Sequence, residues 1–90
     1  MNKSQLVDQV AEATKLPRTQ IEETLNSTFE VIKKAIQEGN DVTLVGFGTF
    51  TRSLRKARTG WNPQTETRIQ IPEMTLPRFK PGKEFRELLQ

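Results

Sequence analysis

Residues 1–39 carry apolar side chains at helical spacing. Asn2 or Ser4 can cap a first helix that should run to about Thr14. A second, longer amphipathic helix is predicted between Pro17, which suits a first helical turn, and Gly39, which supplies a stop signal. The apolar positions are Leu6, Val7, Val10 and Ala11 in the first helix, and Ile21, Leu25, Phe29, Ile32 and Ile36 in the second.

From Asp41 the period of the pattern changes to two, which predicts strands over residues 41–54 with a tight turn or bulge at Gly46-Phe47-Gly48. Alternation resumes at residues 68–76, where Pro72 belongs at an edge or a bend. A short C-terminal helix is predicted from the apolar stripe of Phe85, Leu88 and Leu89. The expected order is α-α-β-β-β-α, which is an α+β fold.

Positive charge is concentrated in one segment of the chain. The net charge is only +3, but residues 1–51 hold five Lys or Arg against seven Asp or Glu, whereas residues 52–83 hold eight against two. Charge that serves solubility alone would not separate in this way, so the basic segment predicts a docking surface for a polyanion. The alternative is a solvated basic face with no partner.

The basic segment includes a stretch that cannot bury itself against a core, since Trp61 is its only sizeable apolar side chain between Leu54 and Ile69. Residues 55–71 are therefore either disordered or a projecting two-stranded ribbon, and the β-rich flanks favour the ribbon. Its tip is the turn Asn62-Pro63-Gln64-Thr65. Because an isolated hairpin is marginally stable, we expect this arm to become ordered on its partner.

Without the arm, about 70 residues remain, near the size at which one core needs additional support. A two-fold dimer would bury the aromatic rings in a shared core and bring two arms together. The alternative is a monomer with loosely covered aromatic rings. The predicted dimer core is Phe29, Ile32, Ile36, Leu44, Phe47, Phe50 and Phe79.

Several other classes of function are disfavoured by composition. The chain has no Cys and no His, so the usual metal ligands and the commonest general base are missing, and no carboxylates are paired at a catalytic spacing. We expect no enzyme activity, metal, cofactor or small-molecule substrate. No apolar run approaches the roughly 20 residues of a membrane span, and the N-terminus lacks the apolar core of a signal peptide, which predicts a cytoplasmic protein.

The chain resembles the bacterial HU/IHF histone-like DNA-binding proteins along its whole length. The matching stretches are Met1-Asn2-Lys3, Val42-Thr43-Leu44-Val45-Gly46-Phe47-Gly48-Thr49-Phe50, Ala57-Arg58-Thr59-Gly60, Asn62-Pro63-Gln64-Thr65 and Pro77-Arg78-Phe79-Lys80-Pro81-Gly82-Lys83. The resemblance implies an intertwined homodimer, or a heterodimer with a related chain. Its parts would be a helical base at 1–39, a sheet at 41–54 and 72–79, the DNA-binding arm at 55–71 and a C-terminal helix at 82–90.

In function, the resemblance implies a nucleoid-associated architectural protein that wraps and bends double-stranded DNA through the minor groove, with low sequence specificity. Pro63 would insert between base pairs as a wedge. Its residue type alone predicts only a turn. Lys3 lies at the start of the first predicted helix, and Lys80 and Lys83 lie around the start of the last. A cation there is unfavourable to the helix dipole unless a phosphate is bound nearby, so these positions favour contacts with the DNA backbone. The predicted DNA-binding residues are Lys3, Arg52, Arg55, Lys56, Arg58, Trp61, Asn62, Pro63, Gln64, Arg68, Arg78, Lys80 and Lys83.

Two residues depart from the family pattern, which usually has Arg at position 61 and Gly at position 66. Trp61 is expected either to act beside Pro63 as an auxiliary wedge or to pack on its own arm. Glu66 would be strained if the tip keeps a left-handed backbone there, and its charge would face phosphate.

Three other functions stay open from the sequence. One is a site- or structure-selective bender of the IHF type, or a viral relative. Another is an RNA or single-strand binder, although such proteins usually display several aromatic side chains. The last is a protein-interaction module that uses the ribbon for strand addition.

Overall fold

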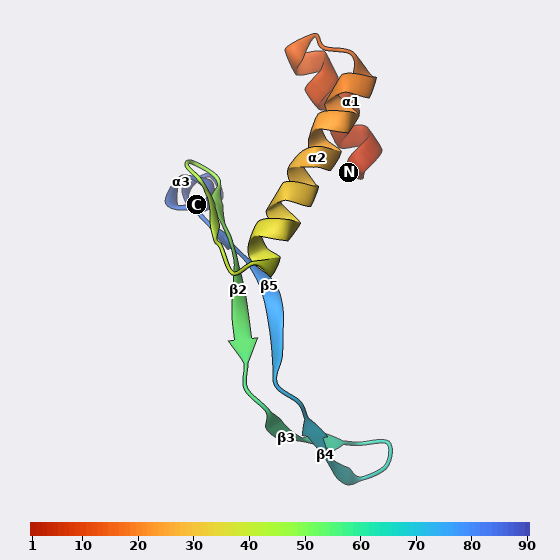
Figure 1. Cartoon of the computed structure of the whole chain (residues 1–90), viewed down its shortest axis with the longest axis vertical. Coiled ribbons are helices and arrows are strands. Elements are labelled where there is room, and N and C mark those ends of the chain that lie inside the picture. The colour runs from red at the N-terminus through yellow and green to blue at the C-terminus, as the bar shows by residue number, and fades with distance from the viewer. The chain divides into compact units, whose positions relative to one another are not determined.

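The computed structural model describes residues 1–90, which form two compact units, Met1–Lys34 and Ala35–Gln90. The α+β class and the order of helices followed by strands are confirmed (Figure 1). None of the helices combines the length and the apolar content needed to cross a bilayer. The elements are α1 (Lys3–Thr14), α2 (Arg18–Gln37), β1 (Val42–Leu44), β2 (Gly48–Arg55), β3 (Arg58–Asn62), β4 (Thr67–Ile71), β5 (Met74–Pro81) and α3 (Lys83–Glu87).

The first unit is a helix pair. Asn2 caps α1, since its side chain accepts a hydrogen bond from the backbone N–H of Gln5 while the Gln5 side chain accepts one from the Asn2 backbone. The guanidinium of Arg18, at the start of α2, joins the two helices by donating to Asp8 at 3.0 Å and to Ser4 at 2.7 Å. The buried hydrophobic side chains of the whole chain are Val7 and Ile21.

The second unit contains a sheet of order β1-β2-β5 and a separate ribbon of β3 and β4. Phe50 lies opposite Val42 on one side and opposite Phe79 on the other, so these three side chains share a face. The ring of Phe79 lies 4.8 Å from that of Phe50 and 5.2 Å from that of Phe47, which in turn stacks on Phe85 of α3 at 5.3 Å. Phe47 and Phe79 nevertheless remain 45% and 36% exposed, so one chain leaves this aromatic face partly uncovered.

Gly48 permits the close approach of β2 and β5. A Cβ at this position would lie 2.6 Å from the carbonyl oxygen of Lys80 and 2.6 Å from Cζ of Phe79. Any larger side chain would therefore force apart the strands and displace a ring of the aromatic face. This constraint explains why the β-rich pattern begins again at a glycine.

The prediction of three strands was wrong in number, because two of the extended segments are each divided and the chain has five strands. The divisions fall at Lys56-Ala57 and at Pro72-Glu73, so they face each other across the hairpin. Pro72 has no N–H to donate to a ladder, which ends the pairing at that point. The predicted C-terminal helix is also shorter, since α3 ends at Glu87 and leaves Leu88 and Leu89 more than 80% exposed beyond it.

Candidate nucleic-acid interface

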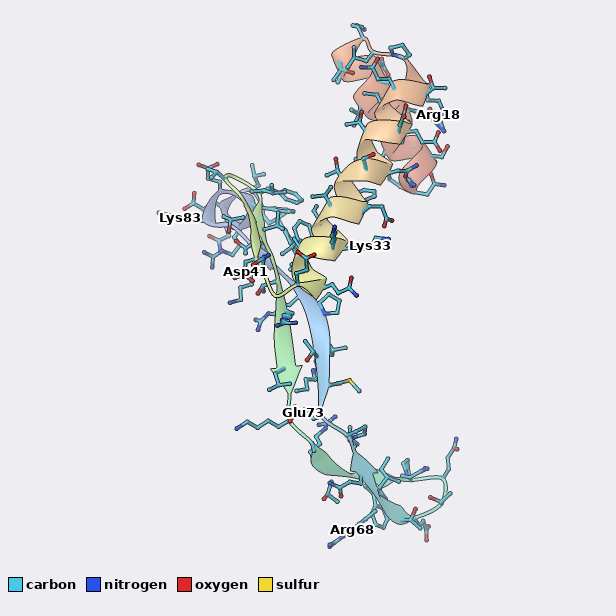
Figure 2. All side chains as sticks on the ribbon, viewed as in Figure 1. Arg18, Lys33, Asp41, Arg68, Glu73 and Lys83 are labelled. Atoms are coloured by element: carbon cyan, nitrogen blue, oxygen red, sulfur yellow. The ribbon has the colours of Figure 1, made fainter.

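The β3–β4 ribbon and the tip between its strands, called here the arm ribbon, present two different faces. Trp61 lies directly opposite Arg68 in the register, so both side chains leave the ribbon on the same side. Thr59 and Gln70 form the next pair on that side. Figure 2 shows Arg68 projecting from the ribbon into solvent. This face thus combines one aromatic ring, one cation and polar neighbours.

The opposite face carries the apolar cluster of the arm ribbon. A Cβ on Gly60 would lie 2.8 Å from Cδ1 of Ile71 and 3.5 Å from Cγ1 of Ile69, so these two side chains cover the glycine. Arg58 is paired with Ile71 and belongs to this face. Trp61 takes no part in the cluster and is 59% exposed.

The tip of the arm ribbon is held by short-range hydrogen bonds. The backbone N–H of Gln64 donates to Oδ1 of Asn62 at 3.0 Å, which fixes the backbone around Pro63. The hydroxyls of Thr65 and Thr67 are hydrogen bonded at 2.6 Å. Glu66, between them, has φ 53°, so the left-handed backbone that would strain a non-glycine residue is present.

A second group of cations lies on the face of the three-stranded sheet that is opposite the aromatic face. Arg78 is paired with Thr51, and Lys80 is paired with Thr49, so two guanidinium or ammonium groups and two hydroxyls share this face. Arg55, at the end of β2, alternates onto the same side. The two threonines were not predicted as site residues. Their position depends on the register of β2 against β5, which the alternation of the sequence does not fix.

Arg52 is separated from these cations by the pleat of β2. It lies opposite Pro77 and shares the face of Phe50. Its guanidinium covers Gly39, where an added Cβ would lie 2.9 Å from Nη2. Gly39 follows the last turn of α2, and a cation is stabilising at a helix C-terminus. The structure therefore gives Arg52 a contact within the protein that the sequence did not predict.

The remaining predicted cations differ in their surroundings. Lys3 is in the first turn of α1, where its ammonium group donates to the side-chain oxygen of Asn26. Lys56 lies between β2 and β3 and is exposed. Lys83 begins α3, and its Nζ lies 3.9 Å from Oε1 of Glu87. Of the eight Lys and Arg in residues 52–83, Lys83 alone has a carboxylate within 4.0 Å, and all eight residues are exposed.

The exposed cations of the ribbon and of the sheet face agree with the description of the family that the chain matches. The family model described as "Bacterial DNA-binding protein" matches residues 1–90. The chain belongs to this family. It is a family of DNA-binding proteins and not of enzymes.

Individual members of the family match over nearly the whole chain. The DNA-binding protein HU of Nostoc is 46% identical over 87 residues, which cover 97% of this chain and 93% of the relative. The DNA-binding protein HU-alpha of Escherichia coli is 43% identical over 90 residues, which cover all of both chains.

Solved structures of the family share the fold. The structure of Anabaena HU in a cocrystal with DNA matches with a TM-score of 0.93 and 45% identity, and covers 99% of this chain and 97% of that one. HU from Thermotoga maritima matches over the full length of both chains with a TM-score of 0.71 and 28% identity.

Replacing Glu66 tests the strain at the tip of the arm. Because glycine adopts positive φ without a steric penalty, Glu66→Gly should stabilise the arm ribbon by about 1 kcal/mol, which corresponds to roughly fivefold slower amide exchange in β3 and β4. Glu66→Gln removes the charge and keeps the strained backbone, so exchange should change little. Equal slowing by both variants would show that charge, and not backbone conformation, limits the stability of the tip.

Proposed function

We propose that this protein is an architectural double-stranded DNA-binding protein that wraps and bends DNA with low sequence specificity and compacts the chromosome. The single observation that carries the proposal is the set of exposed cations in residues 52–83, of which all but Lys83 have no carboxylate within 4.0 Å. Such cations repel one another, so their concentration in one segment of the chain is costly unless a polyanion neutralises them. Membership of a DNA-binding family supports DNA as that polyanion.

Affinity would come mainly from phosphates. Each cation that neutralises a phosphate releases a condensed counterion, so binding driven in this way weakens steeply as salt rises. Arg78 and Lys80 on the sheet offer donors to the DNA backbone. The arm ribbon would lie in the minor groove, where base edges are nearly degenerate, which accounts for low sequence specificity.

Bending would come from Pro63. This residue is exposed at the tip of the arm ribbon, is rigid and apolar, and has no N–H to desolvate. The bond from Gln64 to Asn62 holds the turn in shape while the ring enters the DNA. Apolar wedges of this kind unstack a base step and kink the duplex, at a cost offset by the larger contact that the bent DNA makes.

Wrapping requires two arms, and we propose that a second copy of the chain supplies the second. The aromatic face formed by Phe47, Phe50 and Phe79, together with Leu44, would close against the same face of the partner in an intertwined homodimer. Phe29 of α2, which is partly exposed, stays a predicted residue of the dimer core. A dimer of this kind would also place both arms on one molecule. We further propose that the protein is cytoplasmic and associated with the nucleoid, which contains the DNA that it would bind.

Ring closure of short DNA tests the bending function. A linear duplex shorter than the persistence length of about 150 bp rarely closes unaided, so ligation in the presence of the protein should yield circles. Pro63→Ala should retain most of the affinity and reduce the yield of circles about tenfold, because the wedge contributes to the kink more than to the contact. Gln64→Ala is the control, because it removes a predicted DNA-binding side chain beside the wedge and keeps Pro63. At saturating protein it should give nearly the wild-type yield of circles. Tight binding of wild-type protein without circles would leave a coating protein and contradict the proposal.

The two faces of β2 give a second test, on neighbouring arginines. Arg55→Gln should lower the slope of log affinity against log salt by about one per arm and leave thermal stability almost unchanged, since Arg55 is exposed and forms no ion pair within the chain. Arg52→Gln should leave the salt slope nearly unchanged and lower the melting temperature, because it removes the cation that covers Gly39. Equal losses of salt slope in both variants would assign Arg52 to the DNA surface.

A further inference from the structure

Trp61 has no structural task within the arm ribbon that would explain its size. The apolar contacts of the ribbon are on the opposite face, where Ile69 and Ile71 cover Gly60. The aromatic pairs of the chain are confined to Phe47, Phe50, Phe79 and Phe85, so no ring stacks on the indole. With 59% of its surface exposed, Trp61 is available to a ligand.

The neighbours of Trp61 indicate which part of DNA the indole would meet. Arg68 is directly opposite and has no carboxylate partner, and the next pair on the same face is Thr59 with Gln70. A cation and two polar side chains suit phosphates and sugars, while the indole offers a flat apolar surface and one N–H donor. Two residues of strand span about 6.6 Å, so Trp61 lies at most about two base-pair rises from the wedge residue Pro63. The indole would therefore meet base pairs that the wedge itself leaves stacked.

An indole and a guanidinium respond in opposite ways to the width of the minor groove. The undeformed minor groove is about 6 Å wide, and it is narrower in A-tracts, where the stronger negative potential attracts inserted arginines. An uncharged indole gains nothing from that potential and adds bulk to a ribbon that already needs a widened groove. The energy needed to widen the groove depends on sequence, because A-tracts are stiff and TA and CA/TG steps deform easily.

We infer that Trp61 is a specificity-determining residue that makes the arm select duplex DNA by the deformability of its minor groove. Sites with TA or CA/TG steps are favoured, and A-tracts are disfavoured. The inference rests on the proposed function and adds to it a preference set by one side chain. Pro63 contributes its own preference for deformable steps, so the role of Trp61 is the part of the preference that changes when the indole alone is replaced.

Competition binding with two duplexes of equal length and equal A·T content tests this inference, one built from A-tracts and the other from alternating TA steps. Wild-type protein should bind the alternating duplex about tenfold more tightly. Trp61→Arg should reduce the ratio to about threefold or less, because the guanidinium gains from the narrow groove that excludes the indole. Trp61→Phe, which keeps an uncharged but smaller ring, should give an intermediate ratio and serves as a second variant in case the first perturbs the arm.

Arg58→Gln is the matched control, because Arg58 is on the other face of the same strand. It should weaken binding to both duplexes by the same factor and leave their ratio as in wild type. The inference is overturned if Trp61→Arg keeps the wild-type ratio, or if wild-type protein binds both duplexes equally well. Salt-insensitive or absent binding to both duplexes would instead overturn the proposed function, so the two failures are distinguishable.

Discussion

The aromatic face of the three-stranded sheet is more than one chain can cover. Phe47 and Phe79 remain substantially exposed although they pack on each other, and Val7 and Ile21, both in the first unit, are the buried hydrophobic side chains of the whole chain. A 90-residue chain with so little buried apolar surface has little to offset the conformational entropy lost on folding. The shared core that we propose would supply the missing burial, and the placement of two arms on one molecule would follow from it.

The same constraint explains how charge is distributed. With apolar residues committed to one face of the sheet, the other face is left for Thr49, Thr51, Arg78 and Lys80. In the arm ribbon, apolar packing is limited to Ile69 and Ile71 over Gly60. Because so little apolar packing depends on the arm ribbon, its other side chains can be suited to a ligand at small cost to the stability of the fold. The arm is thus the part of the chain in which function, and not stability, selects the side chains.

Much of this fold follows from the sequence, because its signals are local. The cap at Asn2, the stop at Gly39 and the turn around Gly46 could all be predicted, since each depends on a few neighbouring residues. Strand register could not be predicted, since it depends on partners distant in the sequence. Register places Arg52 opposite Pro77 and brings Thr49 and Thr51 beside Lys80 and Arg78. The division of the strands at Pro72 was signalled, whereas the matching break at Lys56-Ala57 had no signal of its own.

The most direct test of the account is the midpoint temperature of thermal unfolding of the wild-type protein, measured as a function of protein concentration. If folding and association are linked through a shared core, the midpoint should rise as protein concentration rises through the micromolar range, and the folded species should sediment at twice the chain mass of 10.3 kDa. A midpoint that does not depend on concentration, together with a folded species of 10.3 kDa, would contradict the shared core and the pairing of arms that depends on it.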